Sequence, residues 1–133
     1  MSEALVLRED KDGICTLTLN RPEKRNAINR ALFREFRAHI VDIEDGVGDA
    51  GLVVITGAGE HFCAGHDLKS PPHADALGWL RQEMLIVERL TKLRPPVIAK
   101  VRGTCYTGGL ELALAADFIV CGTSARFADT HGK

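Results

Sequence analysis

The chain has 133 residues, the length of one domain, and its 45% hydrophobic and 26% charged residues are ordinary for a globular protein. Its 17 basic and 18 acidic residues leave a formal charge of −1, so no overall field draws it to nucleic acid or to an anionic membrane surface. The N-terminal stretch lacks the basic leader and apolar segment of a signal peptide, and no run reaches the roughly 20 apolar residues of a membrane span. We therefore expect a cytoplasmic protein with neither nucleic acid nor a membrane as partner.

Cysteines and histidines show no metal-binding pattern. The four cysteines are scattered without a CxxC pair, and we expect all of them to be buried, reduced thiols: Cys15, Cys63, Cys105 and Cys121. His61 and His66 stand five apart on one loop, while the other three histidines belong to separate elements. The sequence therefore predicts no metal site.

The first half of the chain alternates strands with a helix. Residues 13–20 alternate between two faces, which predicts a half-buried strand. After a polar turn, apolar residues at helical spacing predict a helix over about 29–44. The continuous apolar run 52–55 then predicts a strand that is buried on both faces and ends in a glycine-rich loop.

The second half repeats this alternation. An amphipathic helix is predicted over 76–93, and a short strand follows over 97–101. A helix of small residues is predicted within 105–117 and a strand from 118. The residues ARF at 125–127 are compatible with one more strand. The predicted apolar face of the amphipathic helix consists of Leu77, Leu80, Met84, Val87 and Leu90. The order predicts a one-domain α/β chain with parallel crossovers.

The loop TGAGEHFCAG invites comparison with phosphate-binding loops. A dinucleotide fingerprint needs GxGxxG, but Phe62 stands at its last glycine position, and the Gly-Lys-Ser/Thr of a Walker loop is absent. Two interpretations remain open from the residues alone. The loop is a tight surface turn, or Gly65 allows the backbone N–H groups beside His66 to meet a ligand.

The stretch YTGGLELALAAD places one carboxylate, Glu111, near the start of a helix that opens with Gly108 and Gly109. A carboxylate in the first helical turn caps free N–H groups and interacts favourably with the helix dipole. The same position also suits a catalytic carboxylate, so the residues alone leave both roles open. The sequence has no GxSxG elbow, and no cysteine is marked as a nucleophile.

Five ordered stretches together resemble the enoyl-CoA hydratase/isomerase family, also called the crotonase family. They are LTLNRPEKRNAIN, VVITGAGEHFCAGHDLK, RPPVIAKVRG, CYTGGLELALAADFIV and ARFADTHG, and they cover nearly the whole chain. The resemblance implies an α/β crotonase-like spiral of ββα turns. Family members are usually about twice as long, so residues 1–133 are expected to be the N-terminal part of a truncated core domain. The C-terminal spiral turns and the trimerisation helices are then absent.

The resemblance also implies a reaction and its residues. The shared chemistry is stabilisation of an acyl-CoA enolate by two backbone N–H groups, which correspond here to His66 and Gly108. Glu111 matches a glutamate that activates water for addition to a 2-enoyl-CoA, as in fatty-acid β-oxidation. His131 stands where the hydratases have their second catalytic glutamate, and is a candidate catalytic residue because a histidine can donate a proton to the α-carbon. The departure also fits a different reaction of the family, or none.

The coenzyme A contacts of the family fall on Arg25, Ala64, Asp67, Leu68 and Lys69. Arg25 and Lys69 match basic residues that meet the phosphates, and Asp67 and Leu68 match backbone contacts. From the residues alone, solvated surface positions are the favoured interpretation of both cations. The resemblance implies an acyl-CoA thioester as substrate, no cofactor beyond the coenzyme A that the substrate carries, and a homo-oligomer, a trimer or hexamer in the family.

Two other functions stay open. One is a different crotonase reaction, such as enoyl-CoA isomerisation or acyl-CoA thioester hydrolysis, because the same oxyanion hole serves all of them. The other is a truncated pseudoenzyme that binds acyl-CoA without turnover. A partial spiral also leaves strand edges and an apolar face uncovered, so we expect these residues to be either a truncated product or a partial chain that needs a partner to close its core.

Overall fold

The computed structural model describes residues 3–67 and 76–129, and its centre is a five-stranded sheet with the order β1-β2-β3-β4-β6. β1 pairs with β2 antiparallel, and the other neighbours are parallel. A second sheet of two short parallel strands, β5 and β7, adjoins it. The strands are β1 (Val6–Lys11), β2 (Ile14–Leu19), β3 (Leu52–Gly57), β4 (Val97–Val101), β5 (Thr104–Tyr106), β6 (Phe118–Cys121) and β7 (Arg126–Ala128).

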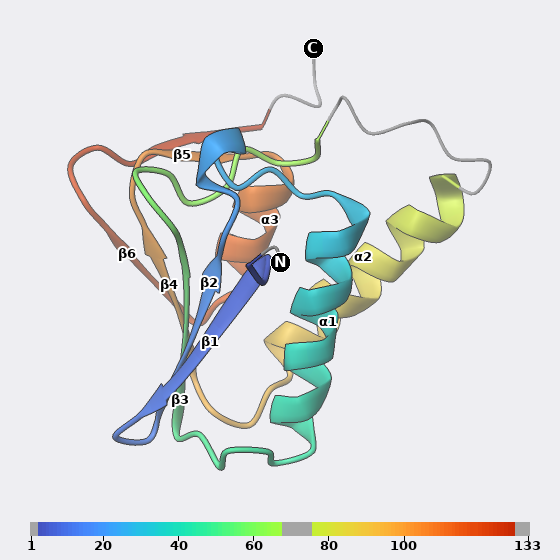
Figure 1. Cartoon of the computed structure of the whole chain (residues 1–133), viewed down its shortest axis with the longest axis vertical. Coiled ribbons are helices and arrows are strands. Elements are labelled where there is room, and N and C mark those ends of the chain that lie inside the picture. The colour runs from blue at the N-terminus through green and yellow to red at the C-terminus, as the bar shows by residue number, and fades with distance from the viewer. Residues whose placement is uncertain (1–2, 68–75, 130–133) are drawn as a thin grey trace.

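Three α-helices lie on one side of the five-stranded sheet: α1 (Arg30–Glu44), α2 (Ala76–Thr91) and α3 (Gly108–Ala115) (Figure 1). A short 3₁₀ helix, η1 (Pro22–Lys24), precedes α1. The side chain of Asn29 caps α1 by accepting a hydrogen bond from the N–H of Leu32 at 2.8 Å. The predicted helix over about 29–44 is therefore confirmed.

The core lies between the sheet and the helices. In β2 and β3, alternate residues are fully buried, among them Leu17 and Ile55, and they meet the apolar stripe of α1 that includes Phe36 and Ile40. The prediction of a half-buried strand is confirmed for β2. For β3 the prediction of burial on both faces is wrong, because Leu52 and Val54 are only partly buried on the face away from the helices.

The parallel crossovers are confirmed, and the structure adds two strands that the sequence did not predict. β1 exposes most of its residues and buries Val6 alone among them, so it has little apolar alternation. β5 has three residues and is defined by its pairing with β7, which begins one residue inside the predicted ARF segment. β1 lacks the alternation and β5 lacks the length that would indicate a strand from local sequence.

α2 runs from Ala76 to Thr91, and its predicted apolar face is partly wrong. The prediction is wrong for Leu80 and Met84, which are exposed, and confirmed for Leu90, which is buried, and for Val87, which packs against the core. The side chain of Leu77 lies outside the described part of the chain, and Ile86, which was not predicted, is buried. The face that packs inward contains Trp79, Glu83, Ile86 and Leu90, spaced by four, three and four residues. α2 therefore has two apolar stripes, and the predicted face took residues from both.

The cysteine prediction needs one correction. Cys15, Cys63 and Cys105 are buried free thiols, but Cys121 at the end of β6 is exposed. β6 is an edge strand, and all four of its residues are exposed. Among the described residues, no helix is both long enough and apolar enough to cross a membrane.

Candidate active site

The loop between β2 and α1 is held against the loop after β3 by the side chain of Asn26, which is fully buried. Its Oδ1 accepts a hydrogen bond from the N–H of Arg21 at 2.8 Å. Its Nδ2 donates to the carbonyl oxygens of Ala58 and His61 at 3.0 and 2.8 Å. One buried amide therefore fixes both loops that carry candidate site residues.

Residues 65–67 run parallel to Ile28. The N–H of Ile28 donates to the carbonyl of Gly65 at 2.7 Å, and the N–H of Asp67 donates to the carbonyl of Ile28 at 2.9 Å. In such a ladder the residue between the two bonds directs its own N–H to the opposite side. Among the described residues, the backbone N–H of His66 has no acceptor.

α3 begins close to this loop. Thr107, which precedes its first residue, has φ 45° and ψ −105°, a conformation that β-branched residues rarely adopt. Gly65 has φ 96°, and a methyl group there would collide with the Thr107 hydroxyl oxygen and lie 3.5 Å from the nitrogen of Gly108. The absence of a side chain at position 65 therefore lets the His66 loop reach the first turn of α3.

The two glycines that open α3 serve the same close approach. A methyl group on Gly109 would lie 2.5 Å from the carbonyl oxygen of Cys63 and 2.7 Å from its Cβ. A methyl group on Gly108 would lie 3.3 Å from Cε1 of His66. Within the described part of the chain, no hydrogen-bond acceptor meets the N–H of Gly108. The backbone N–H groups of residues 66 and 108 thus belong to two segments that are packed directly against each other.

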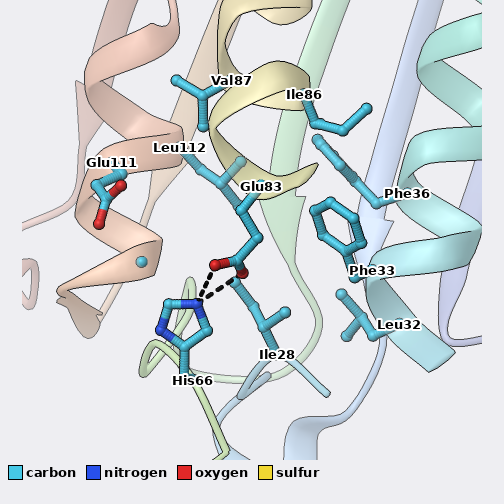
Figure 2. Close-up of a pocket in the computed structure, with 11 residues that line it drawn as sticks. Ile28, Leu32, Phe33, Phe36, His66, Glu83, Ile86, Val87, Glu111 and Leu112 are labelled. Carbon is cyan, nitrogen blue, oxygen red and sulfur yellow. Dashed lines mark hydrogen bonds and ion pairs between the residues drawn. The ribbon is translucent and has the colours of Figure 1, made fainter. Parts of the chain in front are cut away.

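A cavity of about 30 Å³, room for a small number of water molecules, lies where this contact meets α1 and α2. Figure 2 shows its ionisable side chains toward one end and apolar side chains of α1 toward the other. Its ionisable residues are His66, Glu83 and Glu111. The remaining lining residues are Ile28, Leu32, Phe33, Phe36, Ile86, Val87, Gly108 and Leu112.

His66 and Glu83 form an ion pair across this cavity. Nε2 of His66 lies 2.6 Å from both carboxylate oxygens of Glu83, and the two side chains are 26% and 13% exposed. Because a carboxylate only accepts hydrogen bonds, we assign a hydrogen to Nε2. The hydrogen bond to Glu83 raises the pKa of His66 above its usual value, although desolvation opposes the shift; the negative charges of Glu83 and Glu111 add to it.

Glu111 lies in the first turn of α3 and is exposed. Besides the small cavity, it lines an open hollow of about 700 Å³. Leu80, Met84 and Leu85, which α2 turns away from the core, form much of the wall of this hollow. Glu111 therefore lies between the ionisable side chains of the small cavity, His66 and Glu83, and the apolar wall of the open hollow.

The predicted coenzyme A residues that the structure describes lie close together on the surface loops. Arg25 is exposed, and its carbonyl accepts a hydrogen bond from the N–H of Ala64 at 3.0 Å. The carboxylate of Asp67 pairs with Arg21 at 3.2 Å, and its N–H is bonded to Ile28, so a backbone contact from Asp67 to a ligand would use its carbonyl. Leu68 and Lys69 lie outside the described residues, and so does the predicted catalytic residue His131.

Sequence reasoning missed three residues that shape this region: Glu83, Asn26 and Arg21. Asn26 and Arg21 fall within the family-like stretch LTLNRPEKRNAIN, but nothing local marks their burial. Glu83 stands on α2 at helical spacing between Trp79 and Ile86, so the inward stripe of α2 would have indicated it.

Comparisons with known proteins agree with this architecture. The family model described as enoyl-CoA hydratase/isomerase matches residues 9–133. The chain is 33% identical to the Arabidopsis thaliana protein named "Probable enoyl-CoA hydratase 1, peroxisomal", a match that covers 100% of the chain and 50% of that protein. It is 34% identical to the 1,2-epoxyphenylacetyl-CoA isomerase of Escherichia coli, covering 96% of the chain and 51% of the isomerase.

Solved structures show the same fold. An enoyl-CoA hydratase/isomerase from Xanthobacter autotrophicus Py2 matches with a TM-score of 0.87 and 35% identity, covering 96% of this chain and 49% of that one. An enoyl-CoA hydratase from Bacillus anthracis matches with a TM-score of 0.89 and 29% identity, over 96% and 51% of the two chains. The predicted α/β crotonase-like fold is therefore confirmed. The chain spans about half the length of these relatives.

Proposed function

Because the chain belongs to the enoyl-CoA hydratase/isomerase family, we propose that it adds water to the double bond of a 2-enoyl-CoA thioester. The observation that carries this proposal is the meeting of His66, Gly108 and Glu111 in one cavity. Two backbone N–H groups without acceptors among the described residues and one carboxylate are the groups that such a reaction requires.

In the proposed reaction, Glu111 takes a proton from water as the water oxygen bonds to the β-carbon. The electron pair of the double bond moves toward the thioester carbonyl and leaves negative charge on its oxygen. The N–H groups of His66 and Gly108 donate hydrogen bonds to this oxygen, and the dipole of α3 favours the same charge. A proton then reaches the α-carbon, and we propose His131 or the proton held by Glu111 as its source.

The surroundings of Glu111 suit an acyl-CoA. The open hollow beside it is walled by Leu80, Met84 and Leu85, which offer an acyl chain an apolar surface. Arg25 and Lys69 are proposed to meet the phosphates, with Ala64, Asp67 and Leu68 along the coenzyme. Coenzyme A enters as part of the substrate, and no separate cofactor is required. A homo-oligomer and a cytoplasmic location stay predictions.

A second candidate is isomerisation, because the 1,2-epoxyphenylacetyl-CoA isomerase matches this chain as well as named hydratases do. Thioester hydrolysis by the same oxyanion hole is the less supported variant. The third is binding without turnover, because His131 stands where the family resemblance places the second catalytic glutamate. Each candidate retains the acyl-CoA ligand and differs in what happens to it.

The test is hydration of crotonyl-CoA, followed by the loss of its enone absorbance. We expect turnover by the wild-type chain and a loss of roughly a hundredfold or more in Glu111→Gln, which keeps the shape of the side chain and removes the base. Glu9→Gln, on exposed β1, is the matched control and should leave the rate unchanged.

Three results would separate the candidates. Undiminished hydration in Glu111→Gln contradicts the role of Glu111. Tight binding of crotonyl-CoA without turnover by the wild-type chain favours the binding protein. Conversion of a 3-enoyl-CoA to a 2-enoyl-CoA, with no hydration, favours the isomerase.

A further inference from the structure

The imidazole of His66 has one nitrogen committed to Glu83 and one directed toward the start of α3. Nε2 lies 2.6 Å from both Glu83 oxygens (Figure 2). A methyl group added to Gly108 would lie 3.3 Å from Cε1 and 3.6 Å from Nδ1 of the same ring. The ring edge that carries Nδ1 therefore faces Gly108, and the described residues offer Nδ1 no hydrogen-bond partner.

Glu83 determines what Nδ1 offers. The carboxylate requires a hydrogen on Nε2, so in the neutral ring Nδ1 has no hydrogen and is an acceptor. In the imidazolium, both nitrogens donate. Nδ1 is therefore a donor toward Gly108 only when His66 is positively charged.

The charges that face the ring favour the imidazolium. Among the described residues, α2 contributes Glu83 and α3 contributes Glu111, whereas α1 and Ile28 present apolar side chains to the cavity. Asp67, the next residue in the chain, is paired with Arg21. The pKa of His66 is raised, first by its hydrogen bond to Glu83.

We propose that the His66 side chain donates a third, positively charged hydrogen bond from Nδ1 to the thioester oxygen as it becomes an enolate, with Glu83 as the positioning residue that holds the ring. This inference rests on the proposed acyl-CoA site and adds a side chain to its two backbone donors. A charged donor strengthens as the oxygen gains negative charge, so it stabilises the enolate more than the neutral thioester.

Ligand binding tests the proposal without turnover. The probes are acetoacetyl-CoA, which ionises to an enolate, and butyryl-CoA, which remains a neutral thioester of similar size. Binding of both is measured by calorimetry over a pH series for the wild type, His66→Gln and Glu83→Gln. The quantity compared is the ratio of the variant Kd to the wild-type Kd at each pH, which cancels the ionisation of the free ligand.

We expect His66→Gln to weaken acetoacetyl-CoA binding about tenfold to a hundredfold while His66 is protonated, and the ratio to fall toward one as pH rises above the His66 pKa. Butyryl-CoA should change little. In Glu83→Gln the loss should begin at lower pH, and an NMR titration of the His66 ring should show a lower pKa than in the wild type, because the hydrogen bond to the carboxylate is lost. His66→Asn, which can place an amide N–H near the position of Nδ1, should retain part of the affinity.

Several outcomes overturn the proposal. Equal, pH-independent weakening of both ligands in His66→Gln would show that the ring only supports the fold. A His66 pKa that Glu83→Gln leaves unchanged would remove the positioning role. If the wild type binds neither ligand, this inference and the proposed function fail together. If the expected acetoacetyl-CoA pattern appears without crotonyl-CoA hydration, only the hydratase proposal fails.

Discussion

The four cysteines differ in their access to solvent, and this difference sets their reactivity. Burial raises the pKa of Cys15 to about 11 and that of Cys63 and Cys105 to about 12, because a thiolate in the core loses its hydration. Cys121 is exposed on the edge strand β6. The buried thiols are therefore both inaccessible and protonated near neutral pH.

We predict that iodoacetamide at about pH 8 modifies one thiol per native chain, and all four after unfolding in urea. Intact-protein mass spectrometry counts the modified thiols. Cys121→Ser is the control and should leave the native chain unmodified. Rapid modification of Cys63 in the native wild type would show that the loop packed on Gly109 opens readily.

The sequence predicted that His66, Gly108 and Glu111 belong to one site, but it did not predict the pairing of His66 with Glu83. His66, Gly108 and Glu111 line one cavity, and their distinctive surroundings of glycines and a lone carboxylate are visible in the sequence. Their roles stay predictions. The inward stripe of α2 places Glu83 on the face that packs against the core, but its pairing with His66 could not be predicted, because the two residues stand 17 positions apart and a helical glutamate is ordinarily solvated.

Among the elements, α2 offers the sharpest test, because it carries two apolar stripes. Leu90 is 1% exposed and packs into the core, whereas Leu80 is 49% exposed beside the open hollow. Truncating a buried leucine removes apolar contacts and leaves a cavity, while truncating an exposed one does neither.

We predict that Leu90→Ala lowers the free energy of unfolding by about 2–5 kcal/mol and that Leu80→Ala lowers it by less than about 1 kcal/mol. Urea unfolding followed by circular dichroism measures both, and the identical residue change makes each variant the control for the other. Equal losses would mean that both stripes are covered in solution. If α2 guides the acyl chain, Leu80→Ala should instead weaken acyl-CoA binding.

For some of the other elements, the local pattern of apolar residues is sufficient to predict the strand or helix. β2, α1 and β4 follow their apolar periodicity, and Asn29 marks the start of α1 as its cap. β1 and β5 depend on a neighbouring strand for their definition, so their residues alone do not reveal them. The same limit explains β3, whose apolar run is half-buried because helices cover only one face of the sheet.

For the molecule as a whole, the prominent feature is apolar surface at one edge of the sheet. Phe118, at the start of β6, is 65% exposed, and Val120 and the nearby Leu114 of α3 are exposed as well. Edge strands with apolar side chains pair readily with further strands. This surface agrees with the expectation that the core needs a partner to close it.

We predict that the 133-residue chain alone associates beyond its monomer mass of 14.5 kDa, and that Phe118→Lys reduces this association because an edge lysine opposes strand pairing. Sedimentation velocity over a concentration series measures it. Val47→Lys, at an exposed apolar residue outside the sheet, is the control. A monomer at every concentration, with slow amide exchange in β6, would contradict the prediction.

The anchoring of α3 also orders events during synthesis of the chain. The N–H of Thr107 is bonded to the carbonyl of Ala128 at 2.9 Å, and β5 pairs with β7. When the ribosome has just added Glu111, it has not yet synthesised β7, the strand that holds the first turn of α3. The contact between the His66 loop and the first turn of α3 is therefore completed only after residues 126–128 have left the ribosomal exit tunnel.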